Sequence, residues 1–315
     1  MDLFKYHERI GYTFIPNLKV RVDHTDGPYL MRTDQLGFRN DREITNANNS
    51  IFVFGDSFTA GDGVSNGRRY TDFLQEGIKD SEIFNFGLPG SGTDQQYLTW
   101  EAYAKDLSPR LTVIAVLVEN IRRNMVQHRY VVTPEGEKRL KPKPYFDFDE
   151  AGQLVLRQVP VPRDLLPLEA SKNVDQGGKF PGLRKLITDL GLKENLQKFT
   201  KYQPVPGYNS ANSKDWLLMR GILKNWTSQI SGPCVIVPIP LYQHIEETAC
   251  PKAYQTRFSE FSNETSIPVI DPLKKLQLVD VAKRRDYRLK NDTHLSTLGH
   301  KALAGAVLDE ILELI

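Results

Sequence analysis

The stretch IFVFGDSFTAGDGV, residues 51–64, decides the fold of this chain. Its first four residues form a continuous apolar run, which is typical of a central strand covered on both faces. The run stops at Gly55, and Asp56 and Ser57 follow on a glycine-rich turn. Glycine permits a close approach of the backbone, and aspartate can hold such a turn by accepting backbone N–H groups. This pattern predicts a buried strand that delivers a serine hydroxyl to the end of a sheet, although an ordinary turn explains the stretch alone equally well.

Strands and helices alternate on both sides of this stretch. The apolar or β-branched runs that predict strands are 51–54, 83–87, 111–118, 235–239 and 268–270. Segments with helical spacing of apolar residues lie between them, and these are 70–78, a helix that begins at Thr93 or Asp94, 216–230 and a last helix that Ser296 caps. Such alternation predicts an α/β fold, a three-layer α/β/α sandwich with about five parallel strands.

Two regions depart from this alternation. Residues 1–48 are expected to form an N-terminal β appendage, in which 18–22 and 29–33 pair across the turn Asp26-Gly27. Residues 131–208 are rich in proline and turn residues, with a strand-like piece at 153–159 and a helical stretch at 183–199 that Gly191 breaks. A long excursion of this kind is usually a lid or a binding loop. The sandwich itself therefore comprises 49–130 and 209–315, and 131–208 is an insertion that acts as a lid.

The composition narrows the class of protein. With 315 residues, 40% hydrophobic and 25% charged, the chain is an ordinary globular one, and its longest apolar run is too short to span a bilayer. A net charge of +2 gives no electrostatic reason to expect nucleic acid as a partner. The start lacks a basic segment followed by an apolar one, which favours a cytoplasmic location; a periplasmic or secreted one requires a leader that has been removed. Two cysteines, Cys234 and Cys250, make neither a disulfide framework nor a zinc site, and free thiols are expected.

Polar residues gather where the predicted strands end. The carboxyl ends of parallel strands face one crevice, so Ser57, Gly90 and Asn120 are expected to converge there. The loop before the last helix carries Asp292 and His294, a carboxylate and an imidazole two residues apart. An ester-cleaving serine needs a base, a group that orients the base, and donors for the oxyanion. We expect His294 to be the base and Asp292 its partner, with the backbone N–H groups of Ser57 and Gly90 and the Asn120 amide as the oxyanion donors.

These motifs resemble the four blocks of the SGNH (GDSL-type) hydrolase superfamily. The segment 55–59, GDSFT, is similar to the first block, and 85–90, NFGLPG, to the second, whose later glycine donates to the oxyanion. Asn120 stands where the third block has its asparagine. Asp292-Thr293-His294 resembles the last block, in the form found in SGNH-like enzymes that acetylate exopolysaccharides. That block usually has its aspartate where this chain has Asn291, and we prefer Asp292 because only a carboxylate stabilises an imidazolium.

The resemblance implies an SGNH- or flavodoxin-like sandwich and a serine esterase or deacylase. It would hydrolyse an O-acyl ester, an O-acetyl ester in particular, of a carbohydrate or a small natural product through a Ser57 acyl-enzyme. No cofactor is required, and no spacing typical of metal ligands occurs. Two alternatives stay open, an O-acyltransferase that acts on a sugar hydroxyl and a non-catalytic binding protein on the same fold. The sequence does not indicate an oligomeric state.

Several basic residues and a second histidine complete the candidates. Arg122, Arg123 and Arg129 directly follow Asn120, so we expect them to line the pocket and bind substrate. The basic clusters 138–143 and 283–290 are expected on the surface, where the second could attract an anionic substrate. His300 falls inside the last predicted helix, which indicates a structural role.

Overall fold

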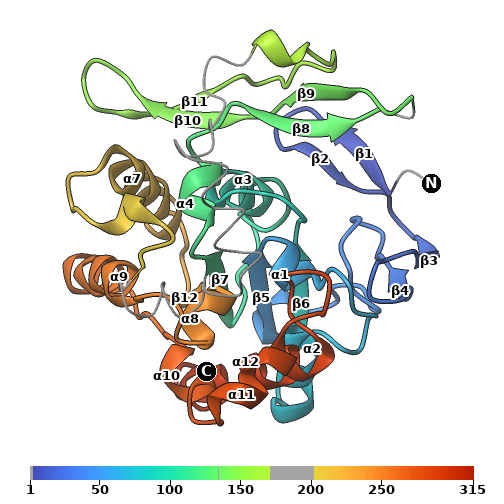
Figure 1. Ribbon diagram of the computed structural model, residues 1–315, viewed down its shortest axis with the longest axis vertical. Helices are drawn as coiled ribbons and strands as arrows, with labels where there is room; N and C mark the ends of the chain where they lie inside the picture. The colour runs from blue at the N-terminus through green and yellow to red at the C-terminus, as the bar shows by residue number, and fades with distance from the viewer. Residues whose placement is uncertain (1–2, 134, 171–201) are drawn as a thin grey trace, which may run out of the picture.

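The computed structural model describes residues 3–133, 135–170 and 202–315 of the chain (Figure 1). The helix predicted at 183–199 lies outside these residues. At the centre is a parallel sheet with the strand order β12-β7-β5-β6. Its strands are β5 (Ser50–Gly55), β6 (Glu82–Gly87), β7 (Leu111–Leu117) and β12 (Cys234–Ile239). Almost every residue in them is buried, as the continuous apolar runs predicted.

The predicted fifth strand is only partly formed. Residues 268–270 make a single parallel bridge, Ile236 with Val269, beyond β12. Two hydrogen bonds hold it, from the Ile236 N–H to the Pro268 carbonyl and from the Ile270 N–H to the Ile236 carbonyl. Pro268 and Pro272 cannot donate to a ladder, so the segment ends before a strand develops. The sheet therefore has four strands and one bridge rather than five strands.

Helices cover both faces of the sheet (Figure 1). On one side α2 (Tyr70–Gly77) packs against α12 (Thr297–Leu312), and on the other α3 (Thr93–Tyr103) packs against α7 (Lys214–Thr227), which contacts α9 (Lys252–Thr265). Ser296 caps α12 by accepting the Gly299 N–H at 3.1 Å, as its position before the apolar run predicted. The expected three-layer α/β/α fold is confirmed.

Short helices lie at the strand ends and in the connections. The α-helical ones are α1 (Ser57–Ala60), α4 (Asn120–Arg123), α8 (Tyr242–Ile245), α10 (Leu273–Leu276) and α11 (Val281–Arg284). The 3-10 turns are η1 (Ala47–Asn49), η2 (Leu168–Ala170), η3 (Pro206–Tyr208) and η4 (Arg285–Tyr287). Two of them, α1 and α4, follow β5 and β7 directly, so they begin at the edge of the sheet where the candidate residues were expected.

Two small antiparallel sheets occupy the N-terminal region. In one, β1 (Phe4–His7) pairs with β2 (Gly11–Phe14). In the other, β3 (Lys19–Val22) pairs with β4 (Tyr29–Arg32), which confirms the predicted pairing across Asp26-Gly27. Tyr12 of β2 joins the main hydrophobic core, so this region packs directly against the sandwich.

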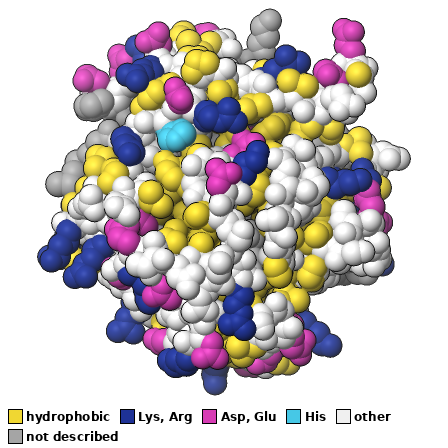
Figure 2. Space-filling model, turned by 180° about the vertical axis from the view of Figure 1, so that it is seen from behind, with side chains coloured by type: hydrophobic (Ala, Val, Ile, Leu, Met, Phe, Trp, Pro, Cys, Tyr) yellow, Lys and Arg dark blue, Asp and Glu magenta, His cyan; other side chains and the backbone are white. Residues whose placement is uncertain are grey.

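Two more hairpins lie in the region predicted as an insertion (Figure 1). They are β8 (His128–Val132) with β9 (Lys138–Pro142), and β10 (Tyr145–Phe148) with β11 (Leu154–Arg157). The β10 strand lies against α3 and α7, so the β10–β11 hairpin packs on the helices of one face. On the face seen in Figure 2, basic and acidic side chains are interspersed, and neither sign dominates.

Candidate active site

The serine sits at the end of β5 on the first turn of α1. Asp56 caps this short helix, because its Oδ1 accepts the Phe58 N–H at 3.0 Å. Ser57 is the first helical residue and is buried. The turn requires a glycine before it, since a Cβ on Gly55 would lie 2.0 Å from Thr59 Oγ1. The local sequence thus fixes both the place and the direction of the Ser57 hydroxyl.

Two hydrogen bonds connect the serine to the loop before α12. Ser57 Oγ lies 2.8 Å from His294 Nε2, and His294 Nδ1 lies 2.8 Å from Asp292 Oδ1. The same Asp292 oxygen accepts the His294 backbone N–H at 3.1 Å. Asn291, the other candidate, instead directs its backbone N–H to Asp26. The structure therefore brings Ser57, His294 and Asp292 together in one chain of contacts and leaves Asn291 out of it.

The charge of Asp292 is favoured by its surroundings. Burial by itself raises the pKa of this carboxyl, but the His294 imidazole, the hydrogen bonds from His294 and a bond from His24 outweigh burial and lower the pKa below its usual range. Asp292 is thus ionised at neutral pH and can stabilise a positive charge on His294.

In the part of the chain that the structure describes, the three expected oxyanion donors make no hydrogen bond. Within the described residues, neither the Ser57 nor the Gly90 backbone N–H donates to another group. Gly90 has φ +72°, a conformation that favours glycine. Asn120 begins α4 and is completely buried, and within the same residues neither of its amide atoms has a partner. A buried amide without a partner is costly, so these donors are suited to a group that arrives from outside.

The Asn85 side chain links the second motif to the serine. Its Nδ2 donates to the Thr59 carbonyl of α1 at 2.5 Å, and its Oδ1 accepts the Gly87 N–H at 2.8 Å. The segments 55–59 and 85–90 are therefore held together by the Asn85 side chain.

The three arginines predicted to bind substrate occupy different surroundings. Arg123 pairs with Asp56 and Arg122 with Glu119, at 2.8 and 3.5 Å, and Arg122 also donates to the Pro204 carbonyl. The guanidinium of Arg129 lies over the Tyr12 ring at 4.2 Å. A Cβ on Gly90 would meet Arg129 Nη2 at 2.6 Å, so this guanidinium lies against the Gly90 backbone. Of the three, Arg129 lines a cavity.

The cavity that Arg129 lines is large. It has a volume of about 1080 Å³ and lies between β1, β2 and the β8–β9 hairpin. Its lining includes Lys5, Tyr6, Tyr12, Arg129, Lys141 and Glu135. Cations outnumber the single carboxylate, and two tyrosines add aromatic surface.

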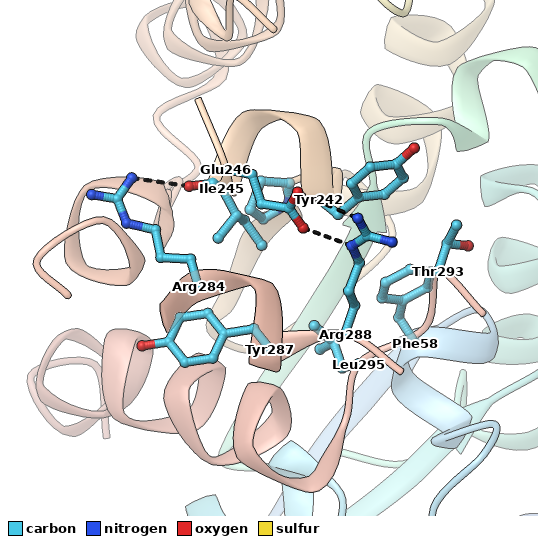
Figure 3. Close-up of a pocket in the computed structure, with 10 residues that line it drawn as sticks. Phe58, Tyr242, Ile245, Glu246, Arg284, Tyr287, Arg288, Thr293 and Leu295 are labelled. Carbon is cyan, nitrogen blue, oxygen red and sulfur yellow. Dashed lines mark hydrogen bonds and ion pairs between the residues drawn. The ribbon is translucent and has the colours of Figure 1, made fainter. Parts of the chain in front are cut away.

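A small hollow lies beside Phe58 (Figure 3). The centroid of the Phe58 ring is 5.0 Å from that of the His294 ring. Arg288 crosses the hollow, donating to Glu246 at 2.6 Å while its guanidinium lies over the Tyr242 ring. Arg284, at its other end, donates to the Ile245 carbonyl. Both arginines were predicted on the surface, yet Arg284 is only 7% exposed, because carbonyls and Glu247 surround it.

Lys143 is a second correction of the same kind. It belongs to the cluster 138–143 that was expected on the surface, but it is 2% exposed and pairs with the buried Asp94 at the start of α3. The Arg123 and Val126 carbonyls accept its other N–H groups at 3.2 Å. The buried positive charge of Lys143 is tolerated because Asp94 and the two carbonyls accept the N–H groups of its ammonium.

His24 is a residue that the sequence analysis missed. Its Nε2 lies 3.2 Å from Asp292 Oδ2, the carboxylate oxygen that His294 does not use. His24 lies in the β3–β4 turn, far from Asp292 in sequence, and no local pattern signals the contact. By contrast, His300 is buried in α12 and accepts the Tyr70 N–H at 3.2 Å, in keeping with a structural role.

The described residues contain no metal-ligand cluster, no disulfide and no membrane-spanning helix. Within them, no three His, Cys, Asp or Glu side chains cluster as metal ligands, and both cysteines are free thiols. None of the helices described is long and apolar enough to cross a membrane.

Comparison with known proteins gives only remote similarities. No known protein family and no curated protein matches the sequence. Among solved structures, a lipolytic G-D-S-L family protein from Veillonella parvula is 14% identical and superposes with a TM-score of 0.44, over 82% of this chain and 96% of that one. An acetyl xylan esterase, AlAXEase, is 12% identical (TM-score 0.45, 83% and 99% covered). The esterase EstA from Pseudoalteromonas sp. is 11% identical (TM-score 0.45, 84% and 97% covered).

Each of these proteins has a TM-score below 0.5 and is less than 25% identical to the chain, so none of them assigns a family to it. Such remote similarity assigns no activity to the chain either.

Proposed function

We propose that the protein is a serine ester hydrolase that works through a Ser57 acyl-enzyme. The observation that carries the proposal is the chain of 2.8 Å contacts from Ser57 Oγ to His294 and from His294 to Asp292. A nucleophile bonded to a base, and a base oriented by a third group, is the arrangement that nucleophilic catalysis needs.

The reaction follows from which atom holds each proton. Asp292 accepts the Nδ1–H of His294, so His294 Nε2 is free to take the proton of Ser57 as Oγ attacks the acyl carbonyl. The imidazolium then gives this proton to the leaving alcohol, and the C–O bond of the ester breaks. In the second half of the cycle His294 removes a proton from water, and the oxygen of this water attacks the carbonyl carbon of the acyl-enzyme. The bond between the acyl carbon and Ser57 Oγ then breaks, the imidazolium returns its proton to Oγ, and the acid leaves.

The negative charge on the carbonyl oxygen needs donors that are already in place. The Ser57 and Gly90 N–H groups and the Asn120 amide are assigned this role, because none of the three has another partner in the described part of the chain. Each such donor contributes roughly 10²–10³ in rate in enzymes that use an oxyanion hole.

We assign the leaving-group side of the substrate to the cavity beside Gly90. Arg129 connects the cavity to this glycine, and the polar and aromatic lining suits an acylated carbohydrate or a similar hydroxylated natural product. The O-acetyl group remains the acyl group that the resemblance implies.

Transfer of the acyl group to a sugar hydroxyl would use the same acyl-enzyme. It requires that water be kept away from the site. The side chains of His294 and Asp292 are 21% and 28% exposed, so solvent reaches the base. This exposure favours hydrolysis over transfer.

A fluorophosphonate probe tests the proposal directly. We expect it to label Ser57 in the native protein, no label in Ser57→Ala, and labelling slowed by at least about 10³-fold in His294→Ala, which lacks the base. Mass spectrometry of the labelled peptide identifies the site. Absence of label from the native protein would favour the non-catalytic binding protein.

A product assay then distinguishes the two enzymes. The native protein should release acetate from p-nitrophenyl acetate without a sugar acceptor. Acyl transfer that depends on an acceptor, with negligible acetate release, would instead identify a transferase.

A further inference from the structure

The turn between β3 and β4 reaches across the molecule to the loop that carries Asp292 and His294. Asp26 Oδ1 accepts the backbone N–H groups of Lys290 and Asn291 at 2.8 and 3.1 Å. The Asn291 side chain donates to the same carboxylate at 3.3 Å. These bonds hold the backbone just before Asp292 in one position.

His24, in the same turn, has a defined tautomer. The Asp26 backbone N–H donates to His24 Nδ1 at 3.1 Å, so in the neutral ring the proton lies on Nε2. That Nε2 is the atom 3.2 Å from Asp292 Oδ2. The ring also packs edge-on against Tyr29 and is only 16% exposed, so it has little freedom to turn away.

The two oxygens of Asp292 therefore have different donors. Oδ1 binds His294 through both its ring and its backbone, and Oδ2 binds His24. A carboxylate held at both oxygens cannot rotate, and its orientation fixes the plane of the His294 ring and the approach of Nε2 to Ser57. Small errors in such an alignment are costly to a reaction.

We propose that His24 is a positioning residue for the reaction, acting on Ser57 through Asp292 and His294. The N-terminal β3–β4 hairpin is then a part of the active site rather than a separate appendage. This inference rests on the proposed serine hydrolase function.

Two substitutions separate this role from a purely structural one. His24→Gln can keep a donor near the position of Nε2 but loses the acceptor for the Asp26 N–H. His24→Asn keeps an acceptor near Nδ1, which preserves the turn, but loses the donor to Asp292. His7→Asn is the matched control, because His7 Nδ1 also accepts turn N–H groups, those of Arg9 and Ile10, at a distance from Ser57.

We expect His24→Asn to lower both kcat for p-nitrophenyl acetate and the rate of fluorophosphonate labelling by roughly 10–100-fold, with KM nearly unchanged, because the misplacement acts on the chemical step. His24→Gln should retain activity within about threefold of the native protein. His7→Asn should be indistinguishable from it. Native-like labelling and kcat in His24→Asn would overturn the proposal, and so would equal losses in His24→Asn and His24→Gln.

Proton NMR supplies a readout that does not need activity. The Nδ1–H of His294, bonded to Asp292, should give a resonance far downfield that persists in His24→Gln and broadens or shifts in His24→Asn. If the native protein takes no fluorophosphonate, the proposed function fails, and this resonance still decides the positioning role. An unchanged resonance in His24→Asn would refute it.

Discussion

Arg123 holds two loops of the site with one guanidinium. Its Nη1 donates to Asp56 Oδ2 at 2.8 Å and to the Ser91 carbonyl at 3.1 Å. Asp56 is 1% exposed, and burial raises the pKa of its carboxyl. Arg123 and the hydrogen bond from the Phe58 N–H act in the opposite direction and favour the charged carboxylate. The arginine therefore keeps a buried charge paired and ties the serine turn to the loop of Gly90. Arg123 was predicted to bind substrate, and the contacts of its guanidinium in the structure are with Asp56 and the Ser91 carbonyl.

Replacing Arg123 by Met should destabilise the protein by about 2–4 kcal/mol, because Asp56 loses its partner, and should also lower kcat. The loss is below that of a fully buried pair, since the Arg123 side chain is 27% exposed. In an Asp56→Asn background the Arg123→Met change should lower the free energy of unfolding much less, since Asn retains the cap to Phe58 without the charge. Urea unfolding of the four proteins measures this coupling. If the stability losses of the two single variants simply add in the double variant, the pairing of Arg123 with Asp56 is contradicted.

At the scale of elements, α1 can follow β5 only because β6 leaves room for it. A Cβ on Gly87, the last residue of β6, would lie 2.2 Å from the Ala60 backbone nitrogen. Backbone atoms cannot move aside as a side chain can, so a larger residue must push α1, and with it Ser57, away from the sheet.

Gly87→Ala should therefore reduce the labelling of Ser57 at least about tenfold and destabilise the fold by on the order of 1–3 kcal/mol. Gly305→Ala is the matched control. Gly305 lies in α12 with no atom within 4 Å of an added Cβ, so this change should leave labelling intact and stabilise the helix by about 0.5–1 kcal/mol. Labelling kinetics and thermal unfolding compare the two, and native-like labelling in Gly87→Ala would show that α1 tolerates the displacement.

The elements of the sandwich could be predicted because each carries its own pattern. The apolar run of β5 and the cap of α12 are local features, and parallel strands then bring Ser57, Gly90 and Asn120 to one edge. Contacts between segments that are distant in sequence produce no local sequence pattern. His24 meets Asp292, and Lys143 meets Asp94, only after the chain has folded. For this reason the sequence indicated Ser57, His294 and Asp292, but neither the contact of His24 with Asp292 nor the burial of Lys143.

For the molecule as a whole, two buried histidines make its stability sensitive to acid. Burial lowers the pKa of His300 to about 3 and that of His244 to about 4. Both values lie below the ordinary 6.5 of the unfolded chain, so on acidification the unfolded state takes up protons before the folded state does. These two histidines therefore contribute a loss of stability as the pH decreases from about 6.5 toward 4, of up to about 1.4 kcal/mol per pH unit for each group.

His300→Asn tests this origin of acid sensitivity. Asn can still accept the Tyr70 N–H that His300 Nδ1 accepts at 3.2 Å, but it does not titrate. Between pH 7 and 5 the variant should lose about 2 kcal/mol less stability than the native protein, whatever its stability at pH 7. Urea unfolding at the two pH values gives the difference. His128→Asn, at a half-buried residue of β8, should change this pH dependence far less, because its ring is not fully desolvated in the fold. An equal loss in His300→Asn and the native protein would mean that His300 does not remain neutral in the folded state at pH 5.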